Sequence, residues 1–137
     1  MNKTHEELFL APQTLRIVDA NLNRLREGIR VVEDICRFYN NSYEFAAKLK
    51  ALRHQARLRD NTALLQARDI LNDPLKETTL SEKSRNSIEE ILLSNFKRAQ
   101  ESARVLEEIL KLTQHNESEK FKQIRYELYD LEKNLLH

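Results

Sequence analysis

The fold is decided by the stretch Asn21-Leu22-Asn23-Arg24-Leu25-Arg26-Glu27-Gly28-Ile29-Arg30-Val31-Val32-Glu33-Asp34-Ile35, because the chain carries the same pattern twice. Seven positions are identical in the second copy, 74 residues later, which reads Asn95-Phe96-Lys97-Arg98-Ala99-Gln100-Glu101-Ser102-Ala103-Arg104-Val105-Leu106-Glu107-Glu108-Ile109. The segments that follow also align, at an offset of 72, where Lys50-Ala51-Leu52-Arg53-His54 matches Lys122-Gln123-Ile124-Arg125-Tyr126. Shared apolar positions are common among amphipathic helices, whereas shared Asn, Arg and Glu are not. The sequence therefore predicts a duplicated long-helix hairpin with pseudo-twofold symmetry.

Apolar residues alternate spacings of three and four along both copies, which is the period of an amphipathic helix. One Gly and two Pro in 137 residues leave little material for hairpin turns, so we expect an all-α antiparallel helical bundle in a single domain over 1–137. The repeat halves are about 12–60 and 86–136, joined by a short helix and a loop within 61–85. The expected helices are 12–38, one capped by Asn41 and Glu44, 63–70, 82–112 capped by Thr79 and Glu82, and one capped by Asn116 and Glu119.

The composition excludes several classes of function. A net charge of +1 lacks the excess of cations that nucleic-acid binding needs, and no segment approaches the ~20 apolar residues of a membrane span. The single Cys36 cannot form an intrachain disulfide, and the first residues lack the pattern of a signal peptide. We therefore expect a cytoplasmic protein that binds neither nucleic acid nor membrane.

A second line of residues lies about 110° from the core stripe on each long helix. It is polar toward the amino end and contains one small residue, as Asn21, Arg24 and Gly28 in one copy and Asn95, Arg98 and Ser102 in the other. Gly28 costs ~1 kcal/mol against Ala inside a helix, which indicates a packing or functional reason for it. The line predicts a cleft between helices, and the alternative is a tight helix crossing in which these side chains only cap and pair.

Paired arginines suit a small polyphosphate ligand, because planar guanidinium groups bind phosphate oxygens bidentately. The duplicated candidates are Arg24 with Arg98, Arg30 with Arg104, and Arg53 with Arg125. Carboxylates near them suit Mg²⁺ bound together with substrate phosphates, and these are Glu27, Glu101, Glu33 and Glu107. The alternative is a solvated ladder of ion pairs three and four residues apart.

Two further groups are candidates. His54 follows Arg53 and suits a ligand contact or a proton carrier, although a half-exposed helix histidine is the better explanation. Arg68-Asp69 opens the central loop, where the carboxylate suits a metal ion or a donor group of a ribose or pyrimidine. Cys36 falls on the apolar stripe and is expected in the core.

Five segments together closely resemble one helical domain: 16–34, 49–54, 67–69, 95–101 and 129–133. That domain occurs alone and fused to the amino terminus of some thiamine-phosphate synthases, and its members are regarded as hydroxymethylpyrimidine-phosphate kinases. The resemblance spans nearly the whole chain. One departure is the loop Ile70-Leu71-Asn72-Asp73-Pro74-Leu75, which keeps Asp73 and lacks the glycines typical of the family.

The resemblance implies ATP-dependent phosphorylation of hydroxymethylpyrimidine phosphate to its diphosphate, in thiamine biosynthesis, with ATP and Mg²⁺ as cofactors. We expect Arg24, Arg30, Arg98 and Arg104 to be catalytic. The expected ligand contacts are Asn21, Asn95, Lys97, Arg53, His54, Arg68, Asp69 and Arg125. Homodimerisation and association with thiamine-phosphate synthase are further expectations. The alternatives are a non-catalytic interaction or dimerisation module and another small helical enzyme that uses arginines, such as a chorismate mutase.

Overall fold

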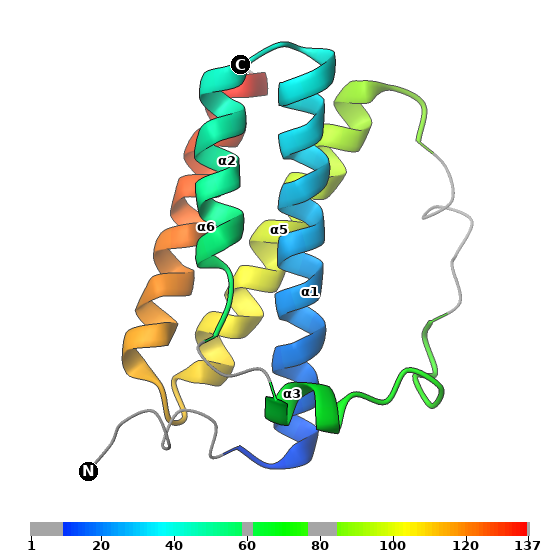
Figure 1. Ribbon diagram of the computed structural model, residues 1–137, viewed down its shortest axis with the longest axis vertical. Helices are drawn as coiled ribbons and strands as arrows, with labels where there is room; N and C mark the ends of the chain where they lie inside the picture. The colour runs from blue at the N-terminus through cyan, green and yellow to red at the C-terminus, as the bar shows by residue number, and fades with distance from the viewer. Residues whose placement is uncertain (1–9, 59–61, 77–84, 137) are drawn as a thin grey trace.

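The computed structural model describes residues 10–58, 62–76 and 85–136, and every regular element in these ranges is helical, which confirms the all-α prediction (Figure 1). The α-helices are α1 (Pro12–Asp34), α2 (Tyr43–Gln55), α3 (Thr62–Ala67), α5 (Ile88–Leu110) and α6 (His115–Leu136), and a π-helical turn, η2 (Ile35–Tyr39), continues α1.

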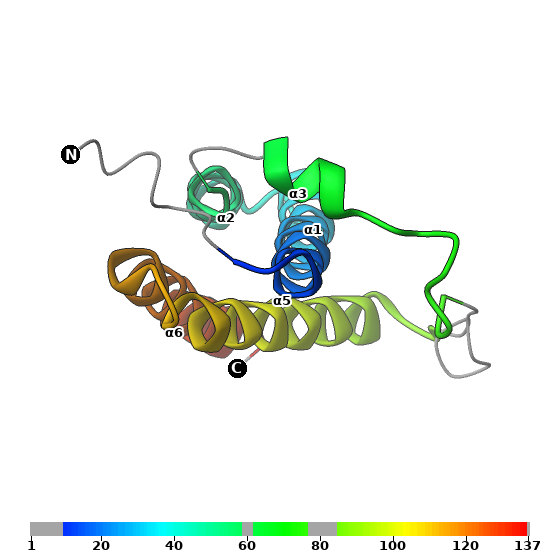
Figure 2. The same ribbon diagram turned by 90° about the horizontal axis from the view of Figure 1, so that it is seen from below.

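The helices form two stacked hairpins. α1 packs against α2 in one layer and α5 packs against α6 in the other, and the layers join where α5 crosses α1 obliquely (Figure 2). The expected apolar stripes are buried at this junction, including Leu25, Ile29, Phe96 and Ala103. This arrangement has the order that a duplicated hairpin requires, and superposition of the two halves by a near-twofold rotation stays a prediction.

Gly28 sits where the two long helices come closest. A Cβ atom at this position would lie 3.1 Å from the carbonyl oxygen of Asn95 and 3.3 Å from the Cβ of Ala99. At these distances even a Cβ atom fits only if α5 shifts by a few tenths of an ångström. The small residue of the second line therefore serves a tight helix crossing, as the packing alternative predicted for it.

Each hairpin is closed by a buried ion pair. Arg53 donates from Nε to Glu33 at 2.7 Å, and its second donor reaches the other carboxylate oxygen at 3.3 Å. Arg125 holds Glu107 in the same way, with 2.9 Å from Nε. The glutamates are 2% and 4% exposed, so their charges depend on arginine partners, and Glu107 also accepts a hydrogen bond from Arg104 at 3.2 Å. The pairs occupy matching positions of the repeat.

Several helix ends differ from the predicted ones. Asn41 and Glu44 do not form a capping box: Asn41 has a left-handed backbone (φ 55°), and Ser42 precedes α2 without a side-chain cap. The first helix ends in a π turn, because the Asn40 N–H bonds to the Ile35 carbonyl five residues back at 2.9 Å.

The second long helix begins six residues later than expected. The hydroxyl of Ser87 accepts a hydrogen bond from the Glu90 N–H at 3.1 Å, and this cap replaces the predicted one. Thr79 and Glu82 lie outside the described residues. Asn116 is already inside α6, which starts at His115.

Replacing Gly28 by Leu should destabilise the protein by about 1–3 kcal/mol or more, because the added side chain must push α5 away from α1. Urea unfolding measures this as a lower transition midpoint. Ala47→Leu on the exposed face of α2 is the control and should change the free energy of unfolding by less than ~0.5 kcal/mol. Equal midpoints for Gly28→Leu and the control would contradict the close crossing.

Removing either arginine of the buried pairs should be costly, because Arg53→Met takes away the hydrogen-bond partner of the buried Glu33 and Arg125→Met leaves Glu107 only the half-exposed Arg104, 3.2 Å away. We expect Arg53→Met to lower the free energy of unfolding by about 3–5 kcal/mol and Arg125→Met to lower it by less. Arg30→Met, which removes a half-exposed pair with Asp34, should cost less than ~1 kcal/mol. The double variant Glu33→Leu, Arg53→Met should recover most of the loss, and failure to recover it would argue against the ion pair as the cause.

Candidate functional site

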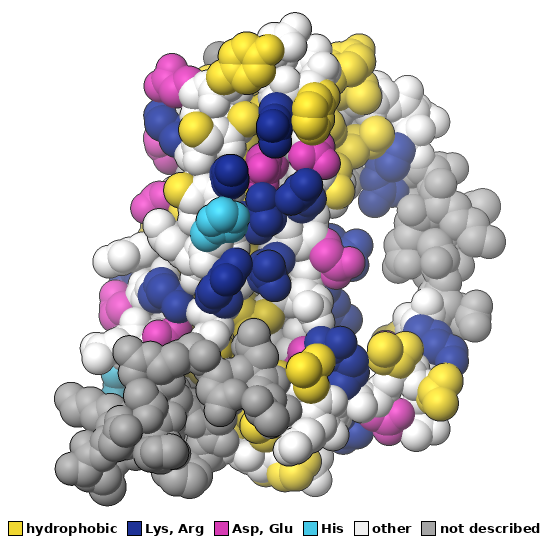
Figure 3. All heavy atoms as spheres, in the orientation of Figure 1, with side chains coloured by type: hydrophobic (Ala, Val, Ile, Leu, Met, Phe, Trp, Pro, Cys, Tyr) yellow, Lys and Arg dark blue, Asp and Glu magenta, His cyan; other side chains and the backbone are white. Residues whose placement is uncertain are grey.

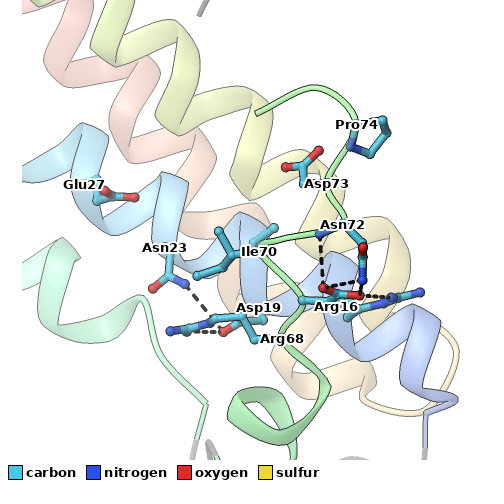
Figure 4. Close-up of a pocket in the computed structure, with 11 residues that line it drawn as sticks. Arg16, Asp19, Asn23, Glu27, Arg68, Ile70, Asn72, Asp73 and Pro74 are labelled. Carbon is cyan, nitrogen blue, oxygen red and sulfur yellow. Dashed lines mark hydrogen bonds and ion pairs between the residues drawn. The ribbon is translucent and has the colours of Figure 1, made fainter. Parts of the chain in front are cut away.

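Two pockets flank the crossing of the long helices. The α1 pocket, about 750 Å³, lies between α1 and the loop after α3 and is lined by Arg16, Asp19, Asn23, Glu27, Arg68, Asp69 and Asp73 among others (Figure 4). The α5 pocket, about 960 Å³, lies between α1, α5 and the same loop and is lined by Asn21, Arg24, Asp73, Lys76, Arg85, Lys97, Arg98, Glu101 and Ser102 among others. Asp73 lines both pockets, so the two pockets meet at the central loop.

The repeat relates the two pockets. Asp19, Asn23 and Glu27 line the α1 pocket, and the positions 74 residues later, Leu93, Lys97 and Glu101, line the α5 pocket. The same face of each long helix therefore builds a pocket on its own side of the crossing. The residues differ between the copies, which gives the pockets different charge.

Charges in the α1 pocket are paired within the protein. Arg68 donates two hydrogen bonds of 2.7 Å to the carboxylate of Asp19, and this interaction raises the pKa of Arg68 (Figure 4). Asp69 accepts from the side chain and the backbone N–H of Asn72, at 2.9 and 3.2 Å, and these bonds lower the pKa of Asp69. Arg16 lies 3.8 Å from Asp69. Arg68 and Asp69 thus hold the loop against α1.

The α5 pocket is cationic. Its lining holds five cations, Arg24, Lys76, Arg85, Lys97 and Arg98, against the two carboxylates of Asp73 and Glu101. Lys97 also lies 3.3 Å from Glu132 on α6. Within the described ranges, no hydrogen bond or ion pair engages Arg24 or Arg98. This pocket can therefore accept an anion without breaking an existing ion pair at those two arginines.

The two predicted asparagines lie at matching positions but play different parts. The side chain of Asn21 donates to the Ile17 carbonyl at 2.9 Å and borders the α5 pocket. The side chain of Asn95 donates to the Ile91 carbonyl at 2.8 Å. The backbone carbonyl oxygen of Asn95 faces Gly28 at the crossing. Asn21 is thus placed near a ligand site, whereas Asn95 belongs to the helix crossing.

The other predicted arginines are not brought to these pockets. Arg53 and Arg125 are engaged by Glu33 and Glu107, and the hydrogen bond to Glu33 raises the pKa of Arg53. Half-exposed ion pairs bind Arg30 to Asp34 at 3.4 Å and Arg104 to Glu108 at 2.9 Å, which matches the ladder alternative. His54 is exposed on α2, away from both pockets.

The predicted magnesium set is not assembled. Glu33 and Glu107 are buried in their ion pairs, while Glu27 and Glu101 lie in different pockets. Over 10–58, 62–76 and 85–136, no three His, Cys, Asp or Glu side chains gather where they could hold a metal ion. The repeat predicts similar helix faces for the four glutamates. A shared face on two different helices does not bring the side chains together in space.

Several pocket residues were not predicted from the sequence, among them Asp19, Lys76 and Arg85. Asp19 is matched in the repeat by the apolar Leu93, so the duplication gave no signal for it. Lys76 and Arg85 flank the central linker and reach the α5 pocket only through the tertiary fold. The excess of cations in that pocket was therefore not visible in the sequence.

The chain matches the ThiD2 family over residues 16–134. It belongs to the ThiD2 family. Among its relatives are proteins named thiamine-phosphate synthase from Nostoc punctiforme, 45% identical over 88% of this chain, and from Synechococcus sp. (strain CC9605), 38% identical over all of it. The matches cover 35% and 39% of those proteins, so the chain spans little more than a third of their length. No solved structure matches the chain.

These relatives correct one expectation of the sequence analysis. Phosphorylation of hydroxymethylpyrimidine phosphate by ATP is wrong on this comparison, because the relatives of this ThiD2 chain are named as synthases and not as kinases. Nothing in those names points to ATP. No described helix has the length and apolar character needed to cross a membrane.

Proposed function

We propose that this ThiD2 chain serves the formation of thiamine phosphate by binding a pyrimidine phosphate, with the phosphate in the α5 pocket. The observation that carries the proposal is the pair Arg24 and Arg98, which enter one pocket from two different helices without a carboxylate partner among the described residues. Two guanidinium groups on either side of one phosphate can each donate two parallel hydrogen bonds. The names of the relatives supply the biosynthetic context.

The α1 pocket complements this arrangement. Its carboxylates and amides, such as Asp73 and Asn23, are the groups that accept hydrogen bonds from a ring amino group. A ligand that spans the two pockets at Asp73 therefore places its anionic end beside the arginines and its ring beside the acceptors. This polarity fits a phosphorylated base and would not suit a molecule with anionic groups at both ends.

Mg²⁺ fits the α5 pocket only as a companion of the ligand. Asp73 and Glu101 provide carboxylate oxygens there, and Mg²⁺ is commonly held by one or two carboxylates together with substrate phosphates. When bound, the ion would neutralise phosphate charge. The residues of this chain orient the ligand, because the arginines fix its phosphate and the loop at Asp73 lies over it.

In this proposal, the transfer reaction that forms thiamine phosphate is carried out by a larger assembly. Because the chain spans little more than a third of its relatives, we propose that it acts as the substrate-binding part of a transferase, in association with a thiamine-phosphate synthase. The phosphate pocket would then hold a substrate for the partner.

Replacing Arg24 or Arg98 by Ala should weaken binding of hydroxymethylpyrimidine phosphate about tenfold or more, since each guanidinium loses its phosphate contact. Isothermal titration calorimetry measures this. The alcohol that lacks the phosphate should bind more weakly than the phosphate by a similar factor. Arg37→Ala, which removes one exposed guanidinium far along the chain from both pockets, is the matched control and should bind like the unaltered protein. Equal affinity for the alcohol and the phosphate would contradict the arginine anchor.

An interaction module is the second candidate, and one surface favours it. Phe38, Tyr39 and Tyr43 are 69%, 65% and 67% exposed at the α1–α2 connection, where apolar side chains show at the end of the molecule (Figure 3). Arg37 lies 4.9 Å from the Phe38 ring. Exposed aromatic rings beside an arginine are typical of protein interfaces.

The two candidates make different predictions for this tip. If the tip forms an interface, Phe38→Ser with Tyr39→Ser should weaken association with a thiamine-phosphate synthase, or with a second copy of this chain, while leaving ligand affinity unchanged. Analytical ultracentrifugation measures the association. A monomer that does not associate with the synthase would exclude the interface at this tip, whatever the calorimetry shows.

A further inference from the structure

A third pocket adjoins the α1 pocket, with which it shares Asp19, Asn23 and Arg68, and lies against the end of α2 and against α3. It is small, about 210 Å³, and three arginines line it: Arg26 from α1, Arg57 just after α2, and Arg68 just after α3. Only one carboxylate, that of Asp19, lines the same pocket, and Arg68 already engages it with two hydrogen bonds. The pocket therefore carries two arginines whose charge is not balanced by its own lining.

These two arginines have no acceptor in the described parts of the chain. The Nε of Arg26 is shielded from solvent and receives no hydrogen-bond partner, which is a costly state for a charged donor. The guanidinium of Arg57 has no bonded carboxylate either, although its backbone carbonyl accepts a hydrogen bond from Lys120 at 2.8 Å. A small anion would supply the missing acceptors.

The surroundings add positive charge. Arg30, Lys50 and His54 are exposed on the same pair of helices, and Figure 3 shows Lys and Arg side chains gathered over α1 and α2. Of these residues, Arg30 has a carboxylate neighbour, Asp34 at 3.4 Å. A positive surface around a concave site raises the local concentration of anions.

The second hairpin shows what the same position looks like without an anion pocket. Arg26 corresponds to Gln100, which donates to Glu132 at 2.6 Å, and Arg57 corresponds to Tyr129, which packs edge-on against Tyr126 with ring centroids 6.0 Å apart. Glu132 is the acceptor for Gln100, and its counterpart at the offset of 72 is Asp60, which lies outside the described residues. Neutral side chains on one hairpin are thus replaced by arginines on the other.

We infer that this pocket binds a phosphate or diphosphate group between Arg26 and Arg57. Its volume suits such a group and is below the range of about 300–1,000 Å³ typical of larger organic ligands. Because the arginines line a concave pocket and not a flat surface, a small anion reaches them better than an acidic protein does. The site shares no lining residue with the α5 pocket and borders the α1 pocket, and the inference rests on Arg26 and Arg57, which the proposed function does not use.

The experiment titrates sodium diphosphate into a protein in which the α5 pocket has been disabled by Arg24→Ala and Arg98→Ala. Amide chemical shifts in ¹H–¹⁵N spectra should move at residues 56–58 and 63–67. Adding Arg26→Gln and Arg57→Gln should weaken this binding about tenfold or more. The matched control adds Lys122→Gln and Lys133→Gln on α6, which removes the same charge from the other hairpin and should leave the affinity unchanged within about twofold. Circular dichroism checks that each variant keeps its helical content.

Three results would overturn the inference. The first is the absence of shift changes at residues 56–58 and 63–67 at millimolar diphosphate. The second is unchanged affinity in the variant with Arg26→Gln and Arg57→Gln. The third is an equal loss in the α6 control, which would show a diffuse attraction to net charge and not a site.

Discussion

The structure depends on the close approach of α1 and α5 at Gly28. A Cβ atom at this position would lie 3.1 Å from the backbone carbonyl oxygen of Asn95, so the two long helices pack closely here. The α1 pocket and the α5 pocket lie beside these helices, and Asp73 of the central loop lines both. A larger residue at position 28 would therefore disturb both the core and the geometry of the candidate site.

The buried pairs of Glu33 with Arg53 and Glu107 with Arg125 explain why some arginines are unsuited to a ligand. A glutamate that is almost fully buried needs its partner, and an arginine that donates two bonds to it has little capacity left for a phosphate. Sequence spacing identified all these residues as a duplicated charged set. Only the partner across each hairpin distinguishes a structural arginine from one that faces a pocket, such as Arg24.

Local patterns predicted the helices well because burial repeats every three to four residues along each of them. The ends were less predictable, since Ser87 with Glu90 and Thr79 with Glu82 are equally good cap signals and only one begins α5. The site depends on contacts between distant segments. Arg68 and Asp19 are 49 residues apart, so no local pattern shows that the loop is bound to α1 through them.

The divergence of the two copies is the strongest argument that the pockets differ in ligand. Related faces of α1 and α5 line them, yet the α1 pocket holds the paired charges of Asp19 and Arg68 and the α5 pocket holds Arg24 and Arg98 without partners among the described residues. Packing constrains the crossing more than the arginines of these pockets, because Arg24, Arg68 and Arg98 are exposed, whereas Asp19 is buried. The predicted duplication would let the fold keep its core while, in the proposed function, one pocket binds an anion and the other accepts hydrogen bonds. Such a polarity orients a phosphorylated ring in a single direction.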